Sequence, residues 1–437
     1  MRKVVFSLLV FLAVSCQGGP RRGGSDGLLT ISLEEHWVDA DTLRVSDYFS
    51  SVEYIPLETS DSCLVGAAPR VFLCRDTLVV VADQTRQGLA FSRSGRFLHP
   101  IGGEGHGPRE YRSARSMIMN IFDATLLFPD YSSGKYKRYT LRSELLAPLK
   151  IAPDSGKYPD QLGWIDRESL VGYFNSVSLW GGAQRIVIYN NEMQVKRVIT
   201  RTATLDTFIY KPKLVNNTLH VDNQTLSVDV IDPASALHSY GLIGYGGVVR
   251  FENRVNGAIK SLFNSGDAVF SYYKGDLYLR EDFNDTIFRV NSDGLHPYVV
   301  FDFGKYHWPI ESRYDEKKYG SSRTFISWYT ENQRHIFFEY FVGVADRTAF
   351  RGSYNKSSQI LRIGKAIDGF YDDINGFMPL QILAKTADGN FVGVLEPLKI
   401  RKWFEENPDK AAALPEHLKA FRNIPEEANP VVVVMRP

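Results

Sequence analysis

Residues 69–83 read PRVFLCRDTLVVVAD, and this stretch holds two short β-prone runs separated by a polar pair. Apolar and β-branched residues fill both runs, while Arg75-Asp76 supplies the turn between them. Two β-rich runs that flank a short polar cluster predict a β-hairpin. The fold of the whole chain depends on how often this unit recurs.

The same unit recurs along nearly the whole sequence. Turn clusters lie between pairs of β-rich runs at Ser94-Gly95, Asn190-Asn191, Lys274-Gly275-Asp276 and Asp388-Gly389. A single β-sandwich needs only about 100 residues, whereas a propeller uses about 40–50 residues for each four-stranded blade. The 437 residues therefore predict an all-β propeller with room for about six to eight blades.

Two segments depart from the strand pattern. Residues 310–339 are charged and partly compatible with a helix, so we expect a short helical insertion carried on a blade. Residues 398–421 predict a C-terminal helical segment of one or two short helices, interrupted by Pro408 and Pro415.

The last residues, NPVVVVMRP, predict a strand that closes the propeller. Propellers often close by pairing strands from both chain ends in one blade, which removes exposed sheet edges. We therefore expect Leu29–Leu33 or Val431–Val434 to take part in closure.

The N-terminus has the layout of a secretory signal. Arg2 and Lys3 precede an apolar run from Val4 to Val14. This run is too short for a membrane-spanning helix, which needs about 20 residues. We expect a signal peptide over residues 1–15.

A cysteine follows the small residue at the end of this signal. The stretch Ala13-Val14-Ser15-Cys16 resembles a lipobox, with Ala where Leu is usual. Lipidation of Cys16 would hold the protein on a membrane by several acyl chains, and the alternative is a plain secretory signal with an incidental cysteine. The Gly-rich residues 16–28 predict a flexible linker.

Composition excludes some partners and leaves the cysteine chemistry open. The formal net charge of +1 provides no bulk field for nucleic acid, so we expect no nucleic-acid partner. Cys63 and Cys74 are compatible with a disulfide between adjacent strands or with two buried free thiols. No C-x-x-C metal pattern occurs.

Five motifs together carry a resemblance to a known family. They resemble the six-bladed β-propeller lipoproteins of Bacteroidetes, whose folds are akin to NHL and TolB propellers. The resemblance implies six blades over residues 29–437 and an outer-membrane lipid anchor. Arg21-Arg22 in the linker favours the periplasmic face, because surface-exported relatives usually carry acids there. In order, the motifs are VEYIPLET (52–59), SGRFLHPIGGEGHGPREY (94–111), NDTIFRV (284–290), YVVFDFGKY (298–306) and EEANPVVVV (426–434).

The glycine-rich stretch HPIGGEGHGPREY, residues 99–111, invites comparison with a phosphate-binding loop. Gly102 and Gly107 have the spacing of the first and last P-loop glycines, but Pro108-Arg109 replaces the required Lys and Ser or Thr. The family resemblance implies instead a connection from one blade to the next. A ligand-contacting loop at the central funnel is the alternative, and its candidate binding residues, together with a distant tryptophan, are Glu104, His106, Arg109, Glu110, Tyr111 and Trp180.

No catalytic or metal motif is complete. His106 between two acids is compatible with a base or a metal ligand, but a solvated loop histidine is the simpler interpretation. Residues 368–377, DGFYDDINGF, lack the ligand phasing of an EF-hand. Four polar residues at the ends of β-rich runs are candidates for a calcium site in the central channel: Asp83, Asp130, Asn175 and Asp282.

These observations favour a non-catalytic binding or scaffold module for a protein or glycan partner. The alternative is a metal-dependent hydrolase or lyase with its site in the central channel. The sequence predicts no resident cofactor, and calcium would accompany only the alternative function.

Overall fold

The structure is a computed structural model that describes residues 28–437 apart from short stretches. Only the backbone is described for the strands within residues 213–264. The stretches left out are 37, 39, 67–68, 83–84, 115, 131–132, 151–158, 175–184, 201–212, 216–217, 222–223, 231–246, 254–258, 265–268, 313–315, 343–347 and 387.

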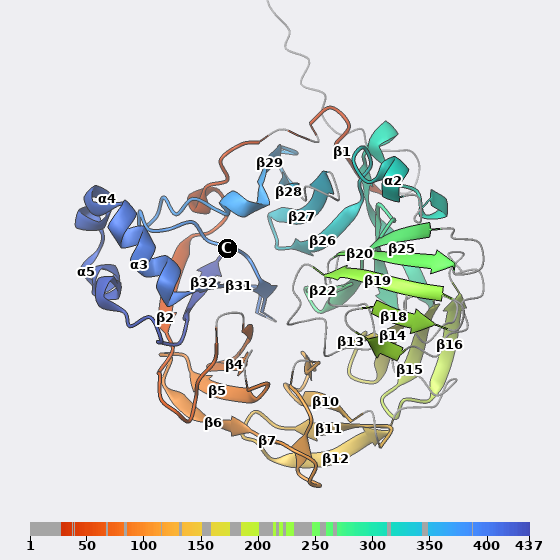
Figure 1. Ribbon diagram of the computed structural model, residues 1–437, viewed down its shortest axis with the longest axis horizontal. Helices are drawn as coiled ribbons and strands as arrows, with labels where there is room; N and C mark the ends of the chain where they lie inside the picture. Colours follow the sequence, from red (N-terminus) through yellow and green to blue (C-terminus); the bar gives the residue numbers. More distant parts are fainter. Residues whose placement is uncertain are drawn as a thin grey trace, which may run out of the picture.

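The chain forms a ring of antiparallel four-stranded blades around a central axis (Figure 1). In the first five blades the strands follow one another outward from the centre in chain order. The first blade contains β3 (Arg70–Cys74), β4 (Thr77–Val81), β5 (Gly88–Ser92) and β6 (Phe97–Ile101). The second contains β9 (Ile118–Met119), β10 (Leu126–Asp130), β11 (Lys135–Tyr139) and β12 (Leu145–Lys150). The third contains β13 (Gln161–Trp164), β14 (Ser169–Phe174), β15 (Arg185–Asn190) and β16 (Val195–Thr200).

The remaining blades come from the second half of the chain. The fourth contains β22 (Phe270–Tyr273), β23 (Asp276–Leu279), β24 (Thr286–Asn291) and β25 (Gly294–Asp302). The fifth contains β26 (Ile326–Glu331), β27 (His335–Val342), β28 (Thr348–Asn355) and β29 (Leu361–Lys365). The sixth contains β30 (Ala384–Lys385), β31 (Phe391–Leu395), β32 (Val431–Arg436) and, as its outermost strand, β2 (Ser51–Pro56).

The blade count follows from the hydrophobic cores. Six buried clusters join each blade to its neighbour around the ring. One of them joins the third blade directly to the fourth through residues such as Val171 and Leu277. The additional sheet that follows β16 in the chain is therefore an insertion and not a seventh blade. Its strands are β17 (Lys213–Val215), β18 (Thr218–Val221), β19 (Gln224–Val230), β20 (Gly247–Asn253) and β21 (Ile259–Asn264).

The sixth blade closes the ring with both ends of the chain. β32 lies between β31 and β2, and it pairs antiparallel with both. Val431, Val432, Val433 and Val434 are fully buried, which explains the unbroken apolar run that predicted a closing strand. This prediction is confirmed for Val431–Val434. The other candidate, Leu29–Leu33, instead supplies β1 (Leu29–Ser32), which pairs parallel with β25 at the outer edge of the fourth blade.

The prediction that residues 310–339 form one insertion is wrong for their second half. Helical turns are confined to η3 (Ile310–Ser312) and α2 (Glu316–Tyr319), while β26 and β27 begin the fifth blade. The misleading signal was charge inside a strand. Glu331 is fully buried in the structure, where its carboxylate accepts hydrogen bonds from Tyr329 and Tyr298 and pairs with Lys356.

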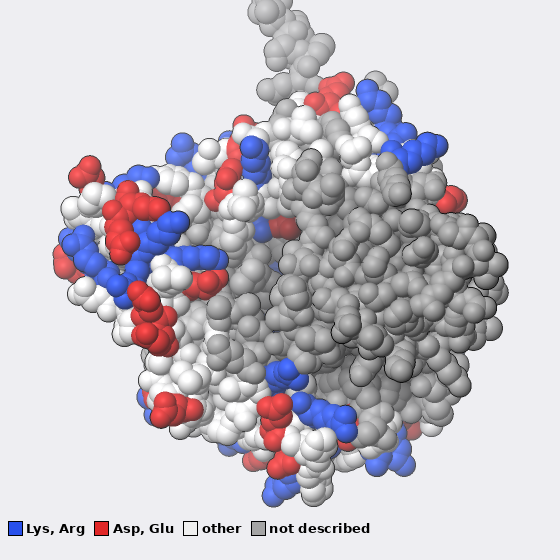
Figure 2. Space-filling model, viewed as in Figure 1, with Lys and Arg blue, Asp and Glu red and all other residues white. Residues whose placement is uncertain are grey.

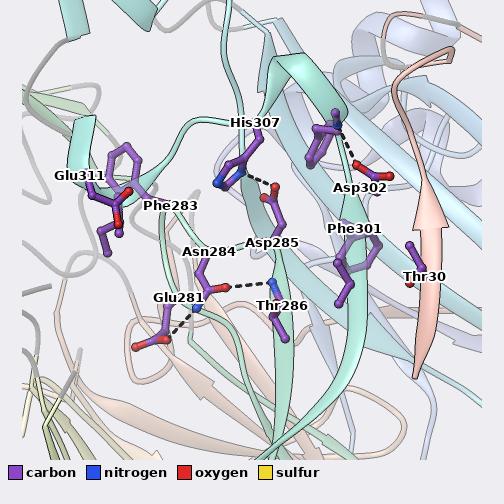
Figure 3. Close-up of a pocket in the computed structure, with 14 residues that line it drawn as sticks. Thr30, Glu281, Phe283, Asn284, Asp285, Thr286, Phe301, Asp302, His307 and Glu311 are labelled. Carbon is purple, nitrogen blue, oxygen red and sulfur yellow. Dashed lines mark hydrogen bonds and ion pairs between the residues drawn. The ribbon is translucent and has the colours of Figure 1, made fainter. Parts of the chain in front are cut away.

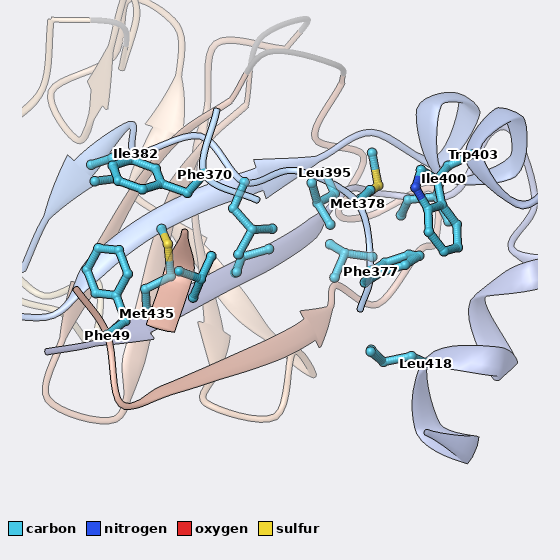
Figure 4. Close-up of a cluster of buried hydrophobic side chains, with 14 of the residues drawn as sticks. Phe49, Phe370, Phe377, Met378, Ile382, Leu395, Ile400, Trp403, Leu418 and Met435 are labelled. Carbon is cyan, nitrogen blue, oxygen red and sulfur yellow. The ribbon is translucent and has the colours of Figure 1, made fainter. Parts of the chain in front are cut away.

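The C-terminal helical segment is confirmed, with three helices where one or two were predicted. Prolines begin α3 (Pro397–Glu406) and α4 (Pro408–Ala413) and precede α5 (Glu416–Lys419). Figure 4 shows how Ile400, Trp403 and Leu418 of these helices gather around Phe377, in the same core cluster as Phe391 and Met435 of the sixth blade. Lys, Arg, Asp and Glu cover the outer surface of this segment (Figure 2).

Candidate functional site

The candidate site is a cavity of about 610 Å³ at one end of the fourth blade (Figure 3). Its walls come from β1, from the β23–β24 loop, from the end of β25 and from the segment that leads to α2. Its described polar lining contains carboxylate, amide, hydroxyl and imidazole groups and no lysine or arginine. These polar residues are Thr30, Glu281, Asn284, Asp285, Thr286, Asp302, His307 and Glu311.

The β23–β24 loop holds its polar groups in a fixed geometry. The Asn284 side chain accepts a hydrogen bond from the Thr286 amide at 3.0 Å and donates one to Glu281 at 3.2 Å. Phe283 adopts a positive φ of 61°, a left-handed conformation that is costly for a bulky aromatic residue. Its ring is buried against Trp308 at 5.2 Å between centroids, and this packing holds the turn in place.

The segment around His307 is held in place by backbone hydrogen bonds and by burial of its neighbour. Its carbonyl accepts a hydrogen bond from the Arg323 guanidinium at 3.1 Å. Its neighbour Trp308 is fully buried, and the Trp308 amide donates to the Thr324 carbonyl at 2.8 Å. Nδ1 of the imidazole pairs with the Asp285 carboxylate, and Figure 3 shows the ring between Asp285 and Glu311. The His307 side chain remains 36% exposed, so its ring is accessible to a ligand.

Electrostatics favour the protonated form of His307. Burial lowers the pKa of this imidazole, but the hydrogen bond and charge of Asp285 outweigh the effect of burial and Glu311 adds to them. The net result is a pKa above the ordinary value. The stability that comes from protonating His307 is therefore present below the unfolded-state pKa of about 6.5 and is lost as pH rises through the folded-state pKa. It requires an ionised Asp285, and burial raises the pKa of that carboxyl, so protonation of Asp285 removes the ion pair at lower pH.

Substituting Asp285→Asn is expected to lower the pKa of His307 below that of the wild type, because burial remains while the carboxylate charge is gone. The measurement is a pH titration of the imidazole resonances by NMR. Asp302→Asn is the matched control, because Asp302 lines the same cavity without pairing with His307. Equal titration curves for Asp285→Asn and the wild type would contradict this assignment of the shift.

The structure places most of the sequence-predicted binding residues in a different part of the ring. Residues 99–111 link β6 of the first blade to the second blade, as predicted. Tyr111 is buried there and stacks on Phe128 at 4.1 Å between centroids. The Glu110 carboxylate accepts a hydrogen bond from the Gly107 amide at 2.8 Å. Both side chains therefore stabilise the connection.

The other members of that loop lie at its surface. Glu104, His106 and Arg109 are exposed, and the Arg109 carbonyl accepts a hydrogen bond from the Tyr139 hydroxyl at 2.6 Å. A binding role for this loop stays a prediction. Cys16 and Trp180 lie outside the described residues.

Two of the four residues predicted for a calcium site in the channel are described, and each has a charged partner within its own blade. Asp130 ends β10 of the second blade near Lys137, whereas Asp282 pairs with the buried Arg280 of the fourth blade. Asp83 and Asn175 lie outside the described residues. Within the described ranges, no group of three or more His, Cys, Asp or Glu residues has the geometry to hold a metal ion. Cys63 and Cys74 are free thiols.

The sequence analysis does not predict the His307 cavity, although two of the family motifs contain residues that line it. Two of the five family motifs, NDTIFRV and YVVFDFGKY, lie on adjacent strands and form two walls of the cavity. The Phe301 amide joins these walls by donating to the Asp285 carbonyl at 2.8 Å. In the sequence these two motifs indicate the fold. Their pairing across β24 and β25 is what brings Asp285 and Asp302 to one cavity.

Comparison with known proteins gives the family. A family described as "Domain of unknown function (DUF4934)" matches residues 28–436. The chain belongs to the DUF4934 family. No curated protein sequence matches this DUF4934 chain.

Solved structures match this DUF4934 chain at low sequence identity. A protein from Bacteroides fragilis whose name suggests export is 14% identical with a TM-score of 0.60, and the match covers 94% of this chain and 99% of that one. A DUF4221 family member from Bacteroides vulgatus is 10% identical with a TM-score of 0.39, covering 89% and 96%. At 14% identity, the likeness to the Bacteroides fragilis protein shows the fold alone. Among the described residues, no helix has the length and apolar character to cross a membrane.

Proposed function

We propose that the protein is a non-catalytic binding module of the cell envelope, held on the outer membrane by a lipid on Cys16, with its ligand site in the His307 cavity. The cavity is the observation that carries this proposal. Its volume of about 610 Å³ lies in the range of small-molecule sites. The exported relative and the lipobox-like stretch support an envelope location.

The lining suits a glycan better than a flat protein surface. Carboxylate and amide oxygens accept hydrogen bonds from sugar hydroxyls, and Asn284 and His307 add donors. Apolar walls from Val300 and Ile310 supply contact area beside these polar groups. A protein partner that inserts a single side chain would use the same groups.

The local chemistry favours binding over hydrolysis. A carboxylate behind a histidine is also found in general-base pairs, but a general base acts as the neutral imidazole, whereas the raised pKa of His307 favours the protonated form. In the described part of the chain, the only side chain that contacts the His307 imidazole polar atoms is Asp285. The pair is therefore suited to orienting a donor toward a ligand.

The test is binding to an array of bacterial and host oligosaccharides, followed by calorimetry on any hit. His307→Ala and Glu311→Ala are each expected to weaken binding by about tenfold or more, because each removes a polar contact worth roughly 1.5 kcal/mol. His106→Ala is the matched control, since His106 is an exposed histidine on the second candidate site. If His106→Ala loses binding while His307→Ala and Glu311→Ala keep it, the binding site lies on the glycine-rich loop and the proposed site in the His307 cavity is wrong.

A further inference from the structure

A cluster around Lys385 lies where the innermost strands of the fourth, fifth and sixth blades approach one another. Lys385 belongs to β30, the innermost strand of the sixth blade. Its Nζ donates to the carbonyl of Glu331 on β26 at 2.6 Å and to the carbonyl of Tyr272 on β22 at 2.7 Å. The side chain therefore reaches from the sixth blade past the fifth to the fourth, on the axial side of the sheets.

The hydrogen bonding of Lys385 is unusual because, among the described residues, no carboxylate takes part in it. A neutral amine has two N–H donors and one lone pair, whereas an ammonium has three donors. Two backbone carbonyls match the two donors of the neutral form, and they leave its lone pair unused. The same two contacts leave one donor of the ammonium form unmatched.

Lys356 provides the contrast within the same cluster. Its ammonium pairs with the Glu331 carboxylate and donates to the Asn332 carbonyl at 2.8 Å. Both lysines approach the ring of Tyr273, with Lys356 Nζ at 4.1 Å and Lys385 Nζ at 5.2 Å from its centroid. Lys356 is therefore held as a cation, and the part of the chain that is described provides no carboxylate paired with Lys385.

The charged groups around Lys385 act on it in opposite directions. Burial lowers the pKa of the Lys385 amine, Glu331 raises it and Lys356 lowers it, and the net value is about 8. The neutral form therefore becomes the major form above about pH 8, and it is already present at neutral pH. Lys385, Lys356 and Tyr273 all remain partly exposed, so a small molecule has access to them.

We propose that Lys385 is a nucleophilic amine in the central channel that binds a small aldehyde or ketone covalently and reversibly as an imine. The amine lone pair attacks the carbonyl carbon, and the resulting carbinolamine loses its oxygen as water. The nitrogen supplies one proton of that water and solvent supplies the other, so the product is a protonated imine that retains one N–H, and hydrolysis reverses the reaction. A protonated imine keeps one N–H for a backbone carbonyl, and its positive charge stays over the face of Tyr273.

The test is reductive trapping on the full chain. The protein is incubated with glycolaldehyde and cyanoborohydride between pH 6 and 9.5, and peptide mass spectrometry follows each lysine. At pH 7 we expect Lys385 to be modified about tenfold faster than exposed Lys399, with a rate that levels off above about pH 8. Labelling of Lys385 no faster than Lys399 would overturn the proposal.

Two variants separate reactivity from mere access. Lys356→Gln removes the neighbouring cation and is expected to slow Lys385 labelling several-fold at pH 7, whereas Lys356→Arg keeps the charge and the rate. An unchanged or faster rate in a folded Lys356→Gln protein would contradict the mechanism, and the wild-type pH profile decides the matter if that variant does not fold. His307→Ala should leave trapping unchanged, so this site and the glycan cavity fail or succeed separately.

Discussion

Substituting Val433→Asp is expected to lower the free energy of unfolding by about 4 kcal/mol or more, which is enough to prevent most of the protein from folding. Val433 is fully buried in β32, opposite Tyr54 of β2 on one side and Gly393 of β31 on the other. A carboxylate at this position would lose its water without gaining a partner. The closing blade would then lose the pairing that joins the two ends of the chain.

Val198→Asp is the matched control for the closing strand. Val198 also lies in a β-strand, but its side chain is 48% exposed on β16. Urea unfolding followed by far-UV circular dichroism should show a change below about 1 kcal/mol for Val198→Asp, since exposed positions are tolerant. Similar losses in the two variants would show that β-strand propensity, and not burial at the closure, determines the effect.

The second large effect is expected at the turn of the first blade. Gly95 and Gly275 each lie in a hairpin turn at φ +83°, but their surroundings differ. A Cβ at Gly95 would lie 2.0 Å from the carbonyl oxygen of Pro56, whereas a Cβ at Gly275 would have nothing within 4 Å. The Gly95 carbonyl also accepts a hydrogen bond from the Glu58 amide at 2.8 Å. The turn is therefore packed directly against the end of β2.

This pair of glycines separates backbone strain from steric overlap. Gly275→Ala is expected to cost about 1 kcal/mol, because a left-handed conformation disfavours a side chain. Gly95→Ala is expected to cost about 3 kcal/mol or more, because the first and sixth blades must also move apart to relieve the overlap. Chemical denaturation of both variants measures the difference. Equal losses would mean that β2 can shift away from the turn without cost.

The fold was predictable because its information is local. Arg75-Asp76, Lys274-Gly275 and Asp388-Gly389 all form the expected hairpin turns, and residues with positive φ occupy each of them. The closing strand was predictable for a similar reason, because four consecutive valines suit only a strand covered on both faces. Each of these signals lies within a few residues of the chain.

The failures involve contacts between distant parts of the sequence. The charge that favoured an insertion over residues 310–339 includes Glu331, which is buried in β26 and pairs with Lys356 near the end of the fifth blade's third strand. The sequence does not distinguish the inserted sheet β17–β21 from a blade, because both consist of short antiparallel β-strands that are consecutive in the chain. The pairing of Asp285 with His307 depends on the path of the chain after β25, which no local pattern specifies.

The closure of the ring also sets the order in which the protein can fold. The Ser50 hydroxyl donates to the carbonyl of Arg436, so this single contact spans 386 residues of sequence. β2 therefore has no partner until nearly the entire chain is available, whereas the hairpins of the first five blades need only neighbours in sequence. Long-range pairing of this kind is slow, since the entropy of a large loop is lost before any contact compensates for it. We therefore expect the closure of the sixth blade to be a late step in folding, and until β2 arrives one edge of β32 is open to pairing with another chain.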